Sequence, residues 1–453
     1  NPAVDALGSN ILLRDRTGGI GLMTTTRPVF AFSNRILNAN YLRFALEQGV
    51  DGHFPTLGGS VQRMKNYTYQ TLGDVANNRK FTLLGDPAMT IALPELDVRT
   101  TAINGRPVGS VPDTLKALDR YTISGIVTDH NGLPQQDFNG TVYPAVFDKE
   151  QVVSTLGNDP GSPVTTFPVR SAQLYNGKVQ VTNGRFSYTF IVPKDINYQY
   201  GKGKLSYYAA SSGADGAGHD PDIIIGGLGN GVQDDGQGPK IKAYLNDEKF
   251  VNGGLTNETP VLLVRLSDSS GINIVGTGIG HSMTAVLDGD TRNTLVLNDF
   301  YEAEADSYQK GTVRFQLSKL EEGVHTLVIK AWDVFNNSAE YALDFRVIHK
   351  ETLAIRHVLN YPNPFTSQTH LWFEHNRPGE ELRVLVQVLT ITGKLVKTIA
   401  KTIITPGNRS DDIGWDGRDE YGAKLGRGVY IYRIRLTSGD GQTVEQLGKM
   451  FML

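Results

Sequence analysis

The spacing of hydrophobic positions divides the chain into an α/β beginning and a long all-β remainder. A short apolar run at 19–24, bounded by glycine, indicates a buried strand, and 80–84 predicts a second one. Helical spacing covers roughly 57–75. Asn38 is a candidate cap for another helix, which would run to about Val50. Short buried strands that alternate with helices are typical of an α/β layer.

After Pro94 the pattern changes to short segments rich in β-branched and aromatic residues, which predict two β units. The expected strands of the first unit are 121–129, 141–147, 177–181, 185–192 and 204–209. Those of the second unit are 261–266, 282–287, 294–298, 312–317, 325–332 and 342–347, with turns at Asp288-Gly289 and Asn336-Asn337. We interpret both units as immunoglobulin-like sandwiches. The stretch 211–238, rich in Gly and Asp, is interpreted as a long loop between them.

The last hundred residues also have a β pattern. The segments 384–389 and 394–399 flank Thr392-Gly393 as a hairpin, and 429–436 is expected to pair with 443–453. With 453 residues, the chain is long enough for several domains. We place their boundaries at 1–95, 96–238, 239–350 and 351–453.

Composition narrows the functional classes. A formal net charge of −3 and a pI near 6.3 give no basic face for nucleic acid, so we expect no nucleic-acid partner. There is no cysteine, which excludes disulfides, Cys-liganded zinc and a thiol nucleophile within these residues. No run of eighteen or more apolar residues predicts a membrane-spanning helix.

Metal-binding patterns are weak, and we expect neither a metal nor a cofactor. Two groups of side chains are candidate cation ligands: His219 with Asp215, Asp220 and Asp222, and Asp416 with Asp419. The first lacks the Asp-x-Asp-x-Asp-Gly spacing of a calcium loop, so a solvated loop is the favoured interpretation. The second contains Asp-Gly, which favours a tight turn with Trp415 on the core.

The C-terminal region carries a series of motifs in a fixed order. They are Asn360-Tyr361-Pro362-Asn363-Pro364-Phe365, Thr392-Gly393-Lys394, Trp415-Asp416-Gly417, Gly428-Val429-Tyr430 and Gly448-Lys449-Met450-Phe451-Met452-Leu453. Together they resemble the C-terminal sorting domain of type IX secretion, which carries proteins across a bacterial outer membrane. The resemblance implies a β-sandwich sorting domain. Its recognition residues would be Gly428, Tyr430, Lys449, Met450, Phe451, Met452 and Leu453, acting in partner contact or in the integrity of the fold.

The first region resembles the end of a gingipain-family cysteine peptidase domain, which has a caspase-like α/β fold. The matching residues are Thr24-Thr25-Thr26, Gly58-Gly59 and Leu84-Gly85-Asp86-Pro87-Ala88-Met89. The resemblance implies that the catalytic Cys and His lie upstream of Asn1, so no catalytic residue is assigned here. It also implies a substrate pocket lined by Thr25, Thr26, Arg27, Phe30 and Phe32. A structural loop with aromatics over the sheet edge is the alternative.

The domain order as a whole resembles the gingipain-family sortase of type IX secretion. The expected activity is removal of client sorting domains and attachment of the clients to anionic lipopolysaccharide. The expected location is the outer face of the outer membrane, after export through the periplasm. Expected partners are the β-barrel PorV, its companions PorQ and PorZ, client proteins, and the N-terminal part of the same protein. The alternatives are a secreted gingipain-like protease client and a non-enzymatic surface adhesin.

Overall fold

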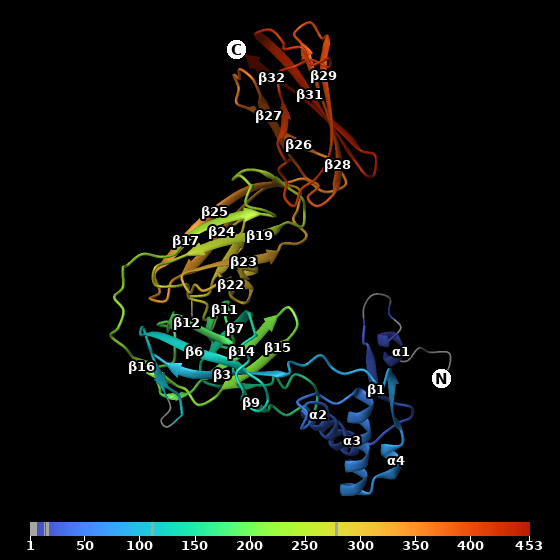
Figure 1. The fold of residues 1–453 in the computed structure, drawn as a ribbon, viewed down its shortest axis with the longest axis vertical. Helices are drawn as coiled ribbons and strands as arrows, with labels where there is room; N and C mark the ends of the chain where they lie inside the picture. The colour runs from blue at the N-terminus through green and yellow to red at the C-terminus, as the bar shows by residue number, and fades with distance from the viewer. Residues whose placement is uncertain (1–6, 13, 15–17, 110–112, 277–279) are drawn as a thin grey trace.

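Four units follow one another along an elongated molecule (Figure 1). The computed structural model describes residues 7–12, 14, 18–109, 113–276 and 280–453. The units are the N-terminal unit (the described residues between 7 and 92), the first sandwich (96–228), the second sandwich (240–347) and the C-terminal sandwich (355–453). The C-terminal sandwich lies at one end, and the N-terminal unit lies beside the first sandwich at the other. The fold is multidomain and mainly β, as predicted, and no described helix is long and apolar enough to span a membrane.

The N-terminal unit pairs two antiparallel strands and covers them with helices. Its elements are α1 (Leu7–Leu12), β1 (Gly21–Thr25), α2 (Ala31–Ala45), α3 (Leu57–Leu72), α4 (Val75–Asn78) and β2 (Phe81–Gly85). Both predicted strands and the helix at 57–75 are confirmed. The predicted cap at Asn38 is wrong, because α2 begins at Ala31, seven positions earlier along the chain. The earlier start is favoured because it places Leu37 inside the helix, packed against Val61 and Met64.

The first sandwich is built on a nine-stranded sheet with the order β10-β7-β14-β15-β3-β6-β12, to which β4 and β11 add. A three-stranded sheet, β13-β16-β5, contributes to the same core, and β8 pairs with β9. The strands are β3 (Leu96–Ile103), β4 (Arg106–Pro107), β5 (Thr114–Ala117), β6 (Arg120–Thr128), β7 (Gly140–Phe147), β8 (Gln151–Ser154), β9 (Thr166–Val169), β10 (Gln173–Asn176), β11 (Val179–Val181), β12 (Arg185–Ile191), β13 (Gly201–Lys202), β14 (Lys204–Ser211), β15 (Asp215–Asp220) and β16 (Ile224–Leu228). Stacked aromatic rings fill the core, with Tyr175 and Tyr188 centroids 5.3 Å apart.

The interpretation of 211–238 as one long loop is wrong, because β15 and β16 lie within it. Glycine explains the error. A Cβ on Gly218 would lie 1.8 Å from the Val98 carbonyl oxygen, and one on Gly216 would lie 3.0 Å from that of Leu96. The missing side chains let β15 lie directly against β3 in parallel pairing. The composition that suggested a loop therefore permits a close approach of two backbones.

The second sandwich packs a four-stranded sheet, β17-β19-β23-β22, against a five-stranded sheet, β18-β25-β24-β20-β21. Its elements are β17 (Lys240–Leu245), β18 (Leu255–Thr256), β19 (Val261–Ser267), β20 (Thr284–Leu287), η1 (Thr291–Asn293), β21 (Leu295–Val296), η2 (Asn298–Phe300), β22 (Tyr301–Ala303), β23 (Lys310–Gln316), β24 (Gly323–Trp332) and β25 (Ser338–Val347). The predicted strand at 294–298 is confirmed only for Leu295–Val296. Asp288 and Gly289 have φ values of 50° and 72°, so the predicted turn is confirmed.

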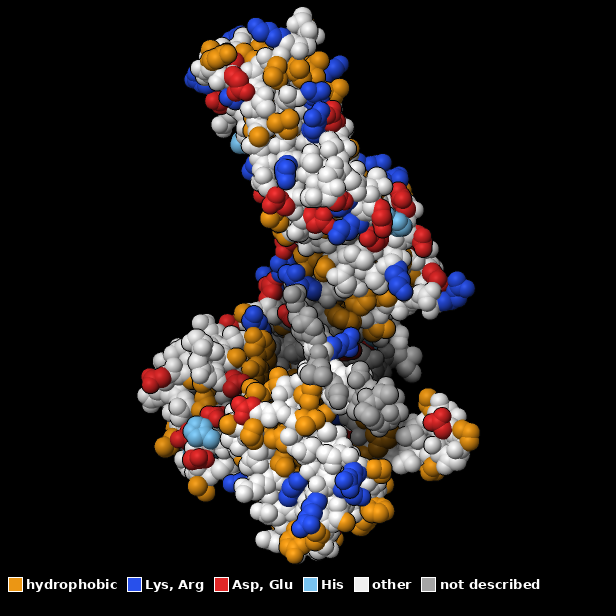
Figure 2. Space-filling view, turned by 90° about the vertical axis from the view of Figure 1, so that its right-hand side faces the viewer, with side chains coloured by type: hydrophobic (Ala, Val, Ile, Leu, Met, Phe, Trp, Pro, Cys, Tyr) orange, Lys and Arg blue, Asp and Glu red, His pale blue; other side chains and the backbone are white. Residues whose placement is uncertain are grey.

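The C-terminal sandwich packs β26-β27-β30 against β29-β28-β31-β32. Its strands are β26 (Ile355–Tyr361), β27 (Thr369–His375), β28 (Glu381–Thr390), β29 (Leu395–Ile404), β30 (Ile413–Trp415), β31 (Gly428–Ser438) and β32 (Thr443–Met452). Both predicted hairpins are confirmed, since β28 pairs with β29 and β31 pairs with β32. Figure 2 shows positive and negative side chains interspersed over the described parts of the upper two units, in keeping with the small net charge.

A partly buried carboxylate joins the first sandwich to the second. The Asp195 side chain, 12% exposed, accepts hydrogen bonds from Asn273 Nδ2 at 3.0 Å and Asn336 Nδ2 at 2.7 Å. It also lies 2.8 Å from His281 Nδ1. The backbone N–H of Lys194 donates to the Val334 carbonyl at 2.8 Å. Several directional bonds therefore converge on one loop, which sets the angle between the two sandwiches.

A second polar joint connects the second sandwich to the C-terminal sandwich. Glu374, 5% exposed, accepts the Leu255 backbone N–H at 3.1 Å and lies 2.8 Å from His357 Nδ1. Asn246 Nδ2 donates to Asn408 Oδ1 at 2.6 Å. These contacts bring β18 and the loop before it against the end of β27 and the loop between β29 and β30. The joint is made of hydrogen bonds rather than of a continuous apolar core.

We predict that Gly448→Ala destabilises the C-terminal sandwich. Gly448 pairs with Tyr432 across β31 and β32, and an added Cβ would lie 2.1 Å from the Tyr432 ring. The ring is buried and its hydroxyl donates to the Val358 carbonyl at 3.3 Å, so it cannot move away freely. The expected loss is about 1–3 kcal/mol, measured by urea unfolding. Gly439→Ala is the matched control because nothing lies within 4 Å of its added Cβ; equal losses in both variants would contradict the packing argument.

We predict that the C-terminal sandwich loses stability as the pH falls from about 6.5 to about 4. His375 is fully buried, and burial lowers its pKa to about 4. The neutral ring accepts the backbone N–H of Arg377 at Nδ1 and donates Nε2–H to Thr405 Oγ1. In the unfolded chain the ring binds its proton near pH 6.5, so acid favours unfolding by about 3 kcal/mol across this window. Unfolding of His375→Gln at several pH values should show a flatter slope; an unchanged slope would contradict the assignment.

Candidate functional site

The five predicted pocket residues lie at the end of β1, on the segment that follows it and in the first turn of α2. Thr25 closes that strand, and Thr26 donates its backbone N–H to the Lys80 carbonyl at 2.9 Å. The Lys80 ammonium reaches back to the Pro28 carbonyl at 2.8 Å. The Phe30 N–H donates to Oδ1 of the buried Asn77 at 3.1 Å. The segment after β1 is therefore held in place by hydrogen bonds from the segment before β2.

The aromatic side chains of this segment face solvent. Phe30 is 66% exposed and Phe32 is 64% exposed, so neither covers the sheet edge as the structural alternative expected. A cation lies over each ring: the Lys80 ammonium is 5.2 Å from the Phe30 centroid, and the Arg35 guanidinium carbon is 5.6 Å from that of Phe32. Arg27 is also exposed. The five residues form an open aromatic and cationic surface, where a chain of complementary charge could bind.

The motifs of the C-terminal sandwich converge in space. Phe365 packs edge-on against Trp415 with centroids 5.6 Å apart, and Trp415 packs edge-on against Tyr430 at 6.1 Å. The backbone N–H of Phe365 donates to the Phe451 carbonyl at 3.0 Å, and Leu453 N–H donates to the Phe365 carbonyl at 2.8 Å. Four motifs that are distant in sequence thus meet along one edge of the sandwich.

Asn363 completes this edge. Its Oδ1 accepts the Phe451 N–H at 2.9 Å, and its Nδ2 donates to the Lys449 carbonyl at 3.2 Å. The Asn-Pro-Phe segment therefore covers the free edge of the last strand, β32, along its C-terminal half. Covering an edge strand blocks uncontrolled pairing with other chains.

The strand alternation separates the seven predicted recognition residues into two groups. Tyr430, Met450 and Met452 are buried in the core, which assigns them to the integrity of the fold. The remaining four are exposed, and they are Gly428, Lys449, Phe451 and Leu453. Phe451 is 45% exposed and pairs with the exposed Val429 on the outer face of the sheet. Of the seven residues, only these four exposed ones can contact a partner protein.

Acidic side chains come together where the sequence did not indicate a site. Asp234, Asp235 and Asp333 place carboxylate oxygens within 4.8 Å of one another, the only such group in the described parts of the chain. Burial, with the nearby Asp333 and Asp235, raises the pKa of Asp268 to about 6. Asp333 already accepts the N–H groups of Phe335 and Asn337. The cluster is explained by turn bonding, and we assign it no ion.

The two groups of candidate cation ligands named from the sequence do not belong to this acidic cluster. Asp215 accepts the Tyr208 hydroxyl and Asp222 pairs with Lys202, so they face different partners. Asp419 accepts the N–H groups of Tyr421 and Ala423. This second group does form the turn that was favoured, with Trp415 3% exposed on the core.

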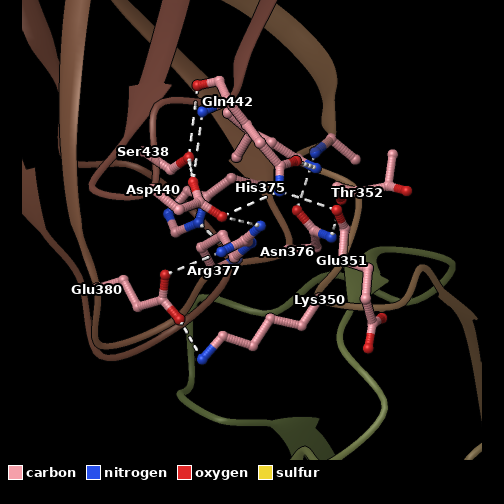
Figure 3. Close-up of polar contacts among 12 residues, drawn as sticks. Lys350, Glu351, Thr352, His375, Asn376, Arg377, Glu380, Ser438, Asp440 and Gln442 are labelled. Atoms are coloured by element: carbon pink, nitrogen blue, oxygen red, sulfur yellow. Dashed lines mark hydrogen bonds and ion pairs between the residues drawn. The ribbon is translucent and has the colours of Figure 1, made fainter.

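The residues that join the last two sandwiches were missed by sequence reasoning. Asn376, Arg377 and Gln442 form a polar cluster around the connecting segment (Figure 3). The one available signal was the run Glu374–Arg377, four consecutive polar residues at the end of a strand. All four are buried, which an alternating strand would not predict.

Several solved structures resemble the chain at low similarity. A tetra-tandem repeat from the extending region of a large adhesion protein has 15% identity and a TM-score of 0.19, covering 79% of this chain and 74% of that one. The Bacteroides ovatus mixed-linkage glucan protein SGBP-B, in complex with a heptasaccharide, has 10% identity and a TM-score of 0.24, covering 79% and 70%. These values are too low to support any functional argument. No curated protein matches the chain.

Two matches are more informative. Residues 1–92 match the family model of Peptidase family C25. Dimeric latent PorU from Porphyromonas gingivalis has 31% identity over 96% of this chain, with a TM-score of 0.38. The chain spans 41% of that PorU chain. Residues 1–92 are similar to peptidase family C25, the gingipain family, and the chain as a whole is similar to PorU.

Proposed function

We propose that the chain is the C-terminal portion of a type IX secretion sortase. The observation that carries the proposal is the combination of a C25 segment with 31% identity to PorU over 96% of the chain. The ordered motifs of the C-terminal sandwich, which converge on its last strand, support it. Family C25 is of the cysteine-peptidase type, which disfavours a purely adhesive protein.

The proposed reaction is a transpeptidation. A cysteine thiolate, activated by a histidine, attacks the carbonyl carbon of the peptide bond before a client's sorting domain. The carbon–nitrogen bond breaks, the sorting domain leaves with a proton as a free amine, and a thioester remains. An amine on anionic lipopolysaccharide, or water, then attacks the thioester and releases the thiolate. Both reacting residues would lie upstream of Asn1.

In this proposal the described residues bind and orient the client. The surface formed by Thr25, Thr26, Arg27, Phe30 and Phe32 follows β1, and ligands of α/β sheets bind at the carboxyl ends of strands. Its exposed rings and cations favour a client segment with apolar and acidic side chains. The C-terminal sandwich would hold the enzyme at the outer face of the outer membrane through PorV, with PorQ and PorZ as companions.

The rival proposal is a secreted gingipain-like protease that is a client of the same system. The two differ in the fate of the C-terminal sandwich, because clients lose it and the sortase retains it. Intact mass of the full-length protein taken from its native cell surface tests this. We expect a mass that includes Leu453; loss of everything after about Leu359 would replace the sortase proposal by the client proposal.

We predict that deleting Lys449–Leu453 from the full-length protein abolishes surface delivery and leaves the upstream sandwiches folded. Substitutions separate the two roles of this segment. Phe451→Ser with Leu453→Ser changes only exposed side chains, so surface delivery should fall while the unfolding temperature is retained. Met450→Ala opens a cavity in the core and should cost about 2–5 kcal/mol. Cell fractionation and thermal unfolding measure both effects.

The control for the exposed pair is Thr443→Ala, an exposed position at the opposite end of β32. Normal surface delivery of the Phe451→Ser and Leu453→Ser variant would contradict a contact role for the outward side chains.

A further inference from the structure

The segment 348–354, which connects the second sandwich to the C-terminal sandwich, has a bonded backbone. Its N–H groups donate as follows: Ile348 to the Thr256 carbonyl at 3.0 Å, Lys350 to Glu258 Oε2 at 3.0 Å, Leu353 to Gln442 Oε1 at 2.7 Å and Ala354 to Asn376 Oδ1 at 2.9 Å. Acceptors on both sandwiches therefore bind the same short segment. A connecting loop on the surface would instead leave these groups to water.

Two side-chain amides of the C-terminal sandwich also bind the carbonyls of this segment (Figure 3). Asn376 Nδ2 donates to the carbonyl of Thr352 at 2.7 Å and to that of His349 at 3.1 Å. Gln442 Nε2 donates to the Glu351 carbonyl at 2.9 Å. Each amide thus accepts one N–H and donates to at least one carbonyl of the same segment. Bonds of both kinds fix a backbone more fully than either alone.

A buried guanidinium is linked through Asp440 to one of the two amides, that of Gln442. Arg377 is 4% exposed, and its Nη1 donates to Glu380 at 3.2 Å while Nη2 donates to Asp440 at 3.4 Å. Asp440 in turn accepts Gln442 Nε2 at 2.9 Å. Glu380 also pairs with Lys350 of the connecting segment at 2.6 Å. Two positive and two negative groups therefore balance within one cluster, and removal of Glu380 or Asp440 would leave the buried Arg377 guanidinium with one carboxylate instead of two.

The charges of the cluster are maintained at neutral pH. Burial alone would raise the pKa of Glu380, but hydrogen bonds from Lys350 and Arg377 outweigh it and lower the pKa. The Ser438 hydroxyl lowers the pKa of Asp440. Both carboxylates therefore stay ionised as partners of Arg377 across the physiological range.

We infer that the connecting segment is a lock that makes the last two sandwiches a single rigid body. The Leu255–Glu374 and Asn246–Asn408 bonds add a second attachment beside the lock, so rotation about the segment would break bonds on both sides. Two consequences follow. The C-terminal sandwich keeps one orientation relative to the rest of the chain, and the segment is closed to endopeptidases, which need a mobile and extended backbone.

The first test measures orientation by distances between spin labels. The chain has no cysteine, so Val324→Cys on β24 and Leu447→Cys on β32, both 64% exposed, give two unique attachment sites. Pulsed dipolar spectroscopy on the otherwise unchanged chain should give one narrow distance distribution. The same pair with Asn376→Ala and Gln442→Ala should give a broad one. A broad distribution without the amide substitutions would overturn the inference.

Gln446→Ala is the matched control for the amide substitutions. Gln446 lies on the same hairpin as Gln442, and none of the hydrogen bonds described for the connecting segment involves it. Equal broadening in this control would assign the change to general loosening of the hairpin and contradict a specific lock.

The second test is limited proteolysis with proteinase K and mass spectrometry, which does not depend on any variant folding. The exposed residues 158–165 between β8 and β9 provide an internal reference. In the unchanged chain, cleavage within 348–354 should be slower than cleavage within 158–165 by about tenfold or more. Equal rates would overturn the inference. In the double variant Asn376→Ala and Gln442→Ala, the two cleavage rates should become similar. An unchanged thermal unfolding transition in that variant confirms that both sandwiches are still folded.

Discussion

The requirement that buried backbone groups form hydrogen bonds shapes this molecule at every joint. Side-chain amides meet that requirement where strand ladders end. Asn363 binds the edge of β32, Asn376 binds the segment 348–354, and Asn298 Oδ1 accepts the Met283 N–H at 2.9 Å. In the second sandwich Asn246 Oδ1 accepts the Val261 N–H at 2.9 Å. An amide can donate and accept at once, so one side chain replaces a missing strand partner.

Much of the fold could be predicted because its signals are local. Turn chemistry at Thr392-Gly393 and Asp288-Gly289 sets the position of a hairpin whatever surrounds it, and both turns are where the sequence placed them. The two strands of the N-terminal unit, β1 and β2, could be predicted for a similar reason, since short apolar runs bounded by glycine have few alternatives. Where long-range contact decides, prediction failed. Gly216 and Gly218 predicted a loop, but in the structure they lie in a strand, β15, directly against the backbone of β3.

At the candidate site the sequence could name residues, whose role stays a prediction, but it could not give their exposure or their neighbours. The residues after β1 could be named from the resemblance, yet only the structure places the Phe30 and Phe32 rings in solvent under cations. The terminal strand shows the same limit. A strand alternates between faces, but the phase of that alternation depends on its partner strand. Pairing of Met450 with Tyr430 turns one face into the core and leaves Lys449 and Phe451 outside.

The absence of cysteine gives the polar joints their importance. With no disulfide to set the angle between sandwiches, orientation depends on bonds such as those at Asp195 and Asn376. Each such bond adds little net stability, about 1 kcal/mol, but a buried group left without its partner costs more than that. Alternative angles are therefore penalised even though the observed angle gains little. In such a chain the polar joints select one angle between neighbouring sandwiches, while the apolar cores of the sandwiches supply the stability.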